Sequence, residues 1–341
     1  MTAFAPASRR RAPIGASAGA LACVLGLLLA PSAAAAQAPA RLARIGFLSF
    51  FPTPAPDHPD PNETAFRQGL RESGYVEGQN VVIERRYADG NAEVLATSAA
   101  ELVRLKVDAI LAGGQPAREA ARKATTTIPI VTLSGSDPVR EGWAKSLARP
   151  GGNVTGLTFT FPELAAKRLE LLKQALPPLT HIAVIIDPVE VVDATDVLRE
   201  TEAGARRLGL KMQVVRIHGS NDLEDAVVRA RRGNAQALVP MAMWPHRREF
   251  AELAARSRLA VMGEESHEVQ AGFLIAYGAD LDDLVRRSAV QVAKILKGAR
   301  PGDLPIERPS KFRLSINLKT AKALGITIPP ALLARADEVI Q

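Results

Sequence analysis

Strand-like and helix-like segments alternate along almost the whole chain after residue 40, and this alternation constrains the fold more than any other feature. Short apolar runs are each followed by a longer amphipathic segment. Several runs, such as residues 182–186, are continuously aliphatic, which is typical of parallel strands buried on both faces. The repeated strand–helix–strand order predicts βαβ units with right-handed crossovers. We therefore predict the α/β fold class.

The predicted strands fall into two series. The first comprises residues 42–49, 80–87, 107–112, 129–133 and 154–158, and the second comprises residues 181–187, 211–217, 235–240, 260–262 and 273–277. Helices are predicted at residues 63–72, 92–105, 117–124, 164–175, 194–208, 223–232, 247–256 and 281–296. Two series favour two doubly wound, Rossmann-like lobes over one large sheet. A Pro-Gly-Gly turn within residues 149–153 indicates the break between them.

Residues 1–38 have the three-part pattern of a secretory signal peptide. Arginines 9–11 precede an apolar run over residues 14–30, and small residues then offer cleavage sites after Ala36 or Ala38. The apolar run is shorter than the roughly 20 residues that span a bilayer, so a retained anchor is the less favoured alternative. We expect export to the periplasm, by the general or the twin-arginine route, and loss of the single cysteine, Cys23, with the signal.

Composition and missing motifs argue against several classes of function. The formal charge is +7, of which three charges are signal arginines, and the other basic residues come as scattered pairs such as Arg231-Arg232. Nucleic-acid binding would need a basic stripe with aromatic residues, so we expect none. No dinucleotide, P-loop or serine-hydrolase motif occurs, and the five histidines lack metal-ligand spacing. We expect no cofactor, no metal and no catalysis, although an exported enzyme stays as a weaker alternative.

Small and polar residues lie where predicted strands of the first series end. Ser49 closes the first strand, residues 113–117 link a strand to a helix, and Ser134 and Asp137 follow another strand. Ligands of open α/β sheets bind at the carboxyl ends of strands. The amides near Gln115 would suit a carboxylate, because a helix N-terminus offers unpaired donors and a positive dipole end.

The second series ends in a similar way. Asp187, residues 243–245 and Glu265 occupy equivalent positions, and the proline-rich residues 51–61 form a predicted loop after the first strand. Each junction alone also fits an ordinary turn with a helix cap. Together they predict a site between two lobes for a zwitterionic or acidic small molecule.

Four longer motifs resemble the ABC-transporter substrate-binding protein family with the type I periplasmic-binding fold. They are AFRQGLRESGYVEGQN at residues 65–80, DPV at 137–139, LARPGGNVTG at 147–156 and INLKTAKALG at 316–325. The resemblance covers essentially the whole mature chain. It implies two lobes joined by three crossovers, hinge closure on an amino acid or small carboxylate, and delivery to a membrane permease with its ATPase. The long proline-rich loop and residues 241–244, which replace small polar residues, depart from the pattern and leave the ligand open.

The resemblance also implies lobe boundaries and ligand contacts. Lobe one would comprise residues 39–157 and 278–305, and lobe two residues 158–277 and 306–341. The implied ligand contacts are Ser49, Gln115, Pro116, Ala117, Ser134 and Asp137 in lobe one, and Asp187, Trp244, Glu265 and Tyr277 in lobe two. We expect a monomer. A ligand-sensing partner of a membrane receptor is an open alternative, whereas a transcription-factor effector domain would need a helix-turn-helix where the signal peptide stands.

Overall fold

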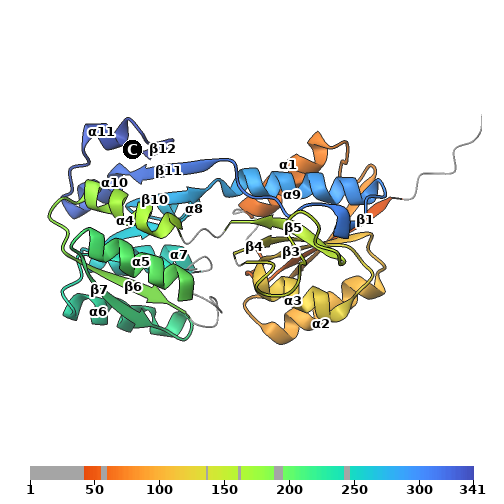
Figure 1. Ribbon diagram of the computed structural model, residues 1–341, viewed down its shortest axis with the longest axis horizontal. Coiled ribbons are helices and arrows are strands. Elements are labelled where there is room, and N and C mark those ends of the chain that lie inside the picture. Colours follow the sequence, from red (N-terminus) through yellow and green to blue (C-terminus); the bar gives the residue numbers. More distant parts are fainter. Residues whose placement is uncertain (1–41, 55–59, 136, 160–162, 188–194, 242–245) are drawn as a thin grey trace, which may run out of the picture. The chain divides into compact units, whose positions relative to one another are not determined.

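The computed structural model describes residues 42–54, 60–135, 137–159, 163–187, 195–241 and 246–341, and these residues form two open sheets covered by helices (Figure 1). The first sheet has five strands in the order β2-β1-β3-β4-β5, all parallel. Their bounds are β1 Ala43–Ser49, β2 Val81–Tyr87, β3 Ala109–Gly113, β4 Ile130–Ser134 and β5 Val154–Thr158.

The second sheet has seven strands in the order β12-β11-β10-β9-β8-β6-β7. Their bounds are β6 His181–Ile186, β7 Lys211–Arg216, β8 Ala237–Met241, β9 Ala260–Gly263, β10 Ile275–Ala279, β11 Phe312–Asn317 and β12 Glu338–Ile340. Strand β11 is antiparallel to β10, and the other pairs are parallel. The predicted α/β class with two doubly wound sheets is confirmed.

The bounds of the helices are α1 Pro61–Glu72, α2 Ala92–Arg104, α3 Gly114–Ala124, α4 Glu163–Ala175, α5 Thr195–Arg207, α6 Leu223–Arg232, α7 Arg247–Arg256, α8 Ser266–Gln270, α9 Leu281–Leu296, α10 Leu318–Leu324 and α11 Pro330–Leu333, with 3-10 turns at Ser220–Asp222 and Pro301–Asp303. The eight predicted helices correspond to α1–α7 and α9, whereas the short helices α8, α10 and α11 were not predicted. Within the described ranges, no helix combines the length and apolar character that a bilayer span requires.

Each face of the first sheet has its own apolar core. Ile45 and Phe47 of β1 pack on one face with α1 and α9, whereas Leu48 packs on the other face with α2 and α3. This division follows from the strand period of two, which sends successive side chains to opposite faces. Figure 1 shows α1 and α9 together on one side of this sheet and α2 and α3 on the other.

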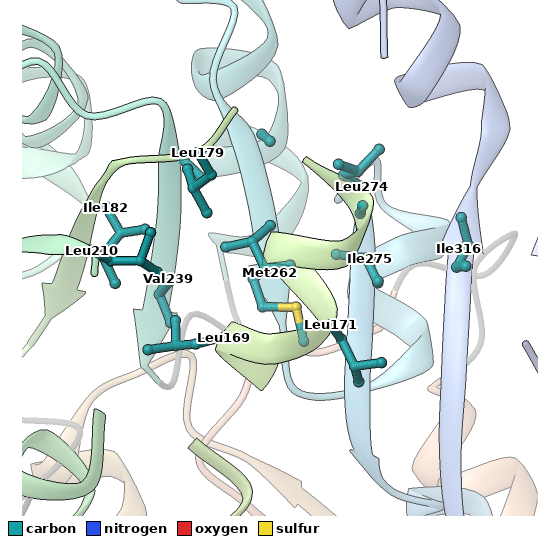
Figure 2. Close-up of a cluster of buried hydrophobic side chains, with 14 of the residues drawn as sticks. Leu169, Leu171, Leu179, Ile182, Leu210, Val239, Met262, Leu274, Ile275 and Ile316 are labelled. Atoms are coloured by element: carbon teal, nitrogen blue, oxygen red, sulfur yellow. The ribbon is translucent and has the colours of Figure 1, made fainter. Parts of the chain in front are cut away.

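The second sheet is covered on both faces as well. Helices α4 and α5 pack on one face, where Met262 of β9 lies with Leu169 and Leu171 of α4 and Ile275 of β10 (Figure 2). Helices α6 and α7 cover the other face through residues such as Phe250. Two buried faces explain why inner strands such as β6 and β8 are almost continuously apolar rather than alternating.

The chain passes from the first sheet to the second after Thr158. It returns to the first sheet after Ala279, as the packing of α9 on α1 shows. It passes again between Glu307, which bridges to Leu157 of β5, and Phe312, where β11 begins. The turn at residues 149–153 precedes β5, which pairs with β4. The change of sheet therefore follows Thr158 rather than the Pro-Gly-Gly turn.

Gly156 in β5 provides a test of how tightly β4 and β5 are packed. Its φ is +148°, and a Cβ atom there would lie 1.9 Å from the carbonyl oxygen of Thr132, whereas a Cβ on Gly152 would meet nothing within 4 Å. We expect Gly156→Ala to lower the free energy of unfolding by about 3 kcal/mol or more, and the control Gly152→Ala to change it by less than about 0.5 kcal/mol. Urea unfolding measures both. Equal effects would contradict the packing described.

Candidate functional site

Three parallel strands of the first sheet bring the predicted residues of this half of the chain to one edge. Strands β1, β3 and β4 are neighbours, with Ser49 opposite Gly113 and Gly113 opposite Leu133. Ser49, the start of α3 and Ser134 therefore lie at the same edge, where ligands of such sheets bind. The Oγ of Ser49 accepts a hydrogen bond of 3.1 Å from the amide of Phe51.

Helix α3 begins three residues before the predicted start. Its N-cap is Gly113, so Gln115 and Pro116 lie in the first turn and are half-buried. Proline is tolerated there because its missing N–H would have no partner within the helix. The side chain of Ala117 is fully buried in the core, so only its backbone is available to a ligand.

A buried arginine holds this edge together. The guanidinium of Arg118, which is fully buried, donates to the Oγ of Ser134 at 3.0 Å and to Glu141 Oε2 at 2.7 Å. It also lies over the ring of Trp143, 5.0 Å from its centroid, and the indole N–H donates to the same Glu141 oxygen at 3.0 Å. Removing one partner of a buried ion pair is costly, so this group fixes the position of Ser134.

Asp137 is exposed and caps the turn that follows β4. Its Oδ1 accepts from the amides of Val139 at 2.9 Å and Arg140 at 3.1 Å. This geometry is that of an Asx turn, in which a short carboxylate satisfies the backbone two and three residues later. The carboxylate therefore has a structural role in the turn.

On the second sheet, Asp187 and Tyr277 also have partners within the protein. Asp187 follows β6, is buried, and accepts from the amide of Gly219 at 2.8 Å. Tyr277 lies in β10, where its ring stacks on Phe312 with centroids 6.4 Å apart. Trp244 lies outside the described residues.

Glu265 stands apart from these residues because its carboxylate is buried and has no well-formed hydrogen bond. It is the N-cap residue of α8, just after β9, and is 5% exposed. Among the described residues, neither carboxylate oxygen has a well-formed hydrogen bond, although the side chain faces the amide of Glu268 in a capping-box arrangement. A buried carboxylate is costly without good donors, so Glu265 is a candidate for binding a cation.

The segment that carries Glu265 is held from two sides. Glu268 Oε2 accepts from the amides of Glu264 at 2.6 Å and Glu265 at 3.1 Å. From α4, Arg168 donates through Nη1 to Glu264 Oε1 at 2.6 Å and through Nε to the carbonyl oxygen of Tyr277 at 2.8 Å. These hydrogen bonds fix the backbone position of Glu265.

His267 is the nearest charged partner of Glu265. Its Nδ1 lies 3.7 Å from Glu265 Oε2, and its Nε2 lies 3.5 Å from Oδ1 of Asp282 in the first turn of α9. The Glu265 carboxylate raises the pKa of His267 above its ordinary value, and burial opposes this. Burial, together with the carboxylates of Glu265 and Glu264, raises the pKa of Glu268 to about 8.

Sequence reasoning found Glu265 from its place after a strand but missed its neighbours. Arg168 and Glu264 are far apart in the chain, as are His267 and Asp282, and only the folded topology brings them together. The one available local signal was Glu268, three residues after the N-cap, which is typical of a capping box. Within the described ranges, no three His, Cys, Asp or Glu side chains are gathered as a metal site.

A comparison with family models matches most of the chain. Residues 57–340 match the ABC transporter substrate binding protein family. The chain belongs to this family. The resemblance expected from the four sequence motifs is thereby confirmed, as is the type I periplasmic-binding fold.

Individual relatives are similar over comparable lengths. A tyrosine-binding protein of Clostridioides difficile (strain R20291) is 29% identical over 278 residues, which is 79% of each chain. The ABC domain of a Streptococcus pneumoniae protein in complex with L-Trp is 27% identical, with a TM-score of 0.77 over 88% of this chain and 100% of the other. A leucine binding protein of Thermotoga maritima, 13% identical with a TM-score of 0.56 over 75% of this chain and 83% of the other, shares the fold. These relatives are binding proteins rather than enzymes.

Glu268 predicts a pH dependence of stability. An ordinary glutamate titrates near 4.5, so between about pH 4.5 and pH 8 the folded protein keeps a proton that the unfolded chain has lost. The stability from this proton is greatest at the acidic end of the window and declines as the pH rises to about 8. We expect Glu268→Gln to remove a decline on the order of 2 kcal/mol, measured by urea unfolding at several pH values.

The matched control is Glu252→Gln, on the exposed face of α7. It should leave the pH dependence of the wild-type protein in place. If Glu268→Gln and wild type lose stability in parallel between pH 5 and pH 8, the raised pKa of Glu268 is wrong.

Proposed function

We propose that this protein is the exported, periplasmic binding component of an ABC importer and that it binds an amino acid with a large apolar side chain. It would deliver this ligand to a permease and its ATPase in the inner membrane. The observation that carries the proposal is the buried carboxylate of Glu265, which follows β9 and lacks a well-formed hydrogen bond among the described residues. The names of two relatives, which bind tyrosine and L-Trp, support the choice of ligand class.

The chemistry of an α-amino acid suits the two sheet edges. Its ammonium group would pair with Glu265 and donate the hydrogen bonds that this carboxylate lacks. Its carboxylate would take the amides of Gln115–Ala117 at the start of the eleven-residue helix α3, where the helix dipole favours an anion. An apolar side chain would then lie between, against Tyr277 and Trp244. Ser49, Ser134, Asp137 and Asp187 would shape the edges on which these groups stand.

We propose further that the two sheets belong to lobes that close on the ligand. Lobe one would comprise residues 39–157 and 278–305, and lobe two residues 158–277 and 306–341. The changes of sheet after Thr158 and after Ala279 support this division. Hinge closure suits such a protein because a few connecting residues absorb the motion while each packed lobe stays rigid.

A matched pair of ligands tests the role assigned to Glu265. L-tryptophan and indole-3-propionate differ only in the ammonium group, and we expect the wild-type protein to prefer the amino acid by about 30-fold or more, because a desolvated charge pair is worth roughly 2–5 kcal/mol. Glu265→Gln should reduce this preference to less than about tenfold, mainly by weakening the binding of L-tryptophan. Calorimetric titration measures both affinities, and L-tyrosine and L-leucine extend the series.

Glu224→Gln, in the exposed first turn of α6, is the control and should keep the full preference. An unchanged preference in Glu265→Gln would place the ammonium elsewhere. If none of these amino acids binds to the wild-type protein, the proposed ligand class is wrong.

A further inference from the structure

We infer that His267 is the counter-ion of the empty site and that the ligand's ammonium displaces its proton, so that ligand binding releases a proton to solvent. This inference rests on the proposed function, since it requires a cationic ligand at Glu265. It makes His267 a residue that determines specificity. Only a ligand that brings its own positive charge can replace the imidazolium.

The geometry gives the imidazole two anionic neighbours and little solvent. Its Nδ1 lies 3.7 Å from a Glu265 oxygen and its Nε2 lies 3.5 Å from an Asp282 oxygen, while its side chain is only 11% exposed. Both separations are too long for a direct hydrogen bond. A protonated ring would therefore stabilise the two carboxylates by electrostatic attraction alone. His267 therefore makes no direct hydrogen bond to Glu265, and both oxygens of this buried carboxylate lack a well-formed hydrogen bond among the described residues.

The other charged groups around His267 determine what an added cation does. Glu268 on α8 is buried, and Arg168 of α4 is paired with Glu264, so neither offers a free charge of its own near neutral pH. Arg247 of α7 is the remaining cation that acts on the imidazole, and it opposes protonation. Before a ligand binds, a protonated His267 would therefore balance the charges of Glu265 and Asp282.

An ammonium group at Glu265 changes this balance. It would lie close to a protonated imidazole, because His267 Nδ1 is 3.7 Å from the Glu265 oxygen that the ammonium would bind. In this largely buried site, water would screen the two positive charges poorly. The proton on His267 is the charge that can leave at the lowest cost, because an imidazole titrates near neutral pH. By thermodynamic reciprocity, the factor by which the ligand weakens proton binding equals the factor by which the proton weakens ligand binding.

Calorimetric titration of L-tryptophan and L-tyrosine between pH 5.5 and pH 8.0 tests the inference. Each titration is repeated in two buffers of different ionisation enthalpy, so that the heat reports the protons released. We expect wild-type affinity to rise by about fivefold or more between pH 5.5 and pH 7.5, with measurable proton release. His267→Gln keeps a polar group of similar size but cannot titrate, and its affinity should stay within about twofold over the same range.

Two further variants separate His267 from the other titrating groups. Glu268→Gln removes the second group that could release a proton, and it should retain the rise in affinity with pH whatever its absolute affinity. His181→Gln, at the start of β6, removes a histidine whose Nδ1 faces the hydroxyl of Thr180, and it should behave as wild type. Thermal unfolding of each variant shows that it is folded before titration.

The possible failures are distinct. Proton release that persists in His267→Gln, or that disappears in Glu268→Gln, would overturn the assignment to His267. Tight binding with an affinity independent of pH would overturn the inference and leave the proposed function intact. Absence of binding at every pH would overturn both.

Discussion

Burial of both faces of two parallel sheets is the constraint on which the rest of the structure depends. Because helices cover each face, the inner strands are mostly apolar, and many polar groups collect in the turns at the sheet edges. In a parallel sheet, the carboxyl ends of neighbouring strands meet at one edge. The cores around Phe66 and Met262 therefore do more than stabilise the fold, since they hold Ser49, Ser134 and Glu265 at or just after strand ends, where we propose that the ligand binds.

The polar side chains at the two sheet edges differ in how fully they are hydrogen-bonded. In the first sheet, the buried guanidinium of Arg118 pairs with Glu141 and Ser134, and Asp137 caps its own turn. These contacts hold the turn after β4 beside the start of α3. In the second sheet, Arg168 and Glu268 saturate the backbone and side chain around Glu264 and leave Glu265 without a well-formed hydrogen bond. The proposed ligand ammonium would suit this edge, because it could donate hydrogen bonds to a buried carboxylate that His267 compensates only through charge.

The sequence predicted helix bounds correctly where the amphipathic pattern was long and regular. The helices Leu223–Arg232, Arg247–Arg256 and Leu281–Leu296 have the predicted bounds, because a long amphipathic pattern is bounded by capping and turn residues. Helix α8 is five residues long and too short to show a helical period, and β11 pairs in the opposite direction to its neighbour β10. Neither was predicted, and both pack around Glu265 or its supporting strands.

Some residues of the candidate site could also be predicted from the sequence, and others could not. Residues at strand ends, such as Ser49 and Glu265, were found because topology alone places them at an edge. Arg118 and Arg168 were missed, since each acts through a partner that only the tertiary fold supplies, and His267 was missed because its second partner, Asp282, comes from another helix. Prediction from one sequence therefore placed polar residues at the strand ends but did not identify the charged side chains that surround them.

A crystal structure of the protein with L-tryptophan would test the central claim most directly. The account predicts the ligand's ammonium nitrogen within hydrogen-bond distance of a Glu265 carboxylate oxygen and its carboxylate on the amides at the start of α3. A structure in which L-tryptophan occupies another surface, or in which a protein group donates to both Glu265 oxygens while the ligand is bound, would contradict it.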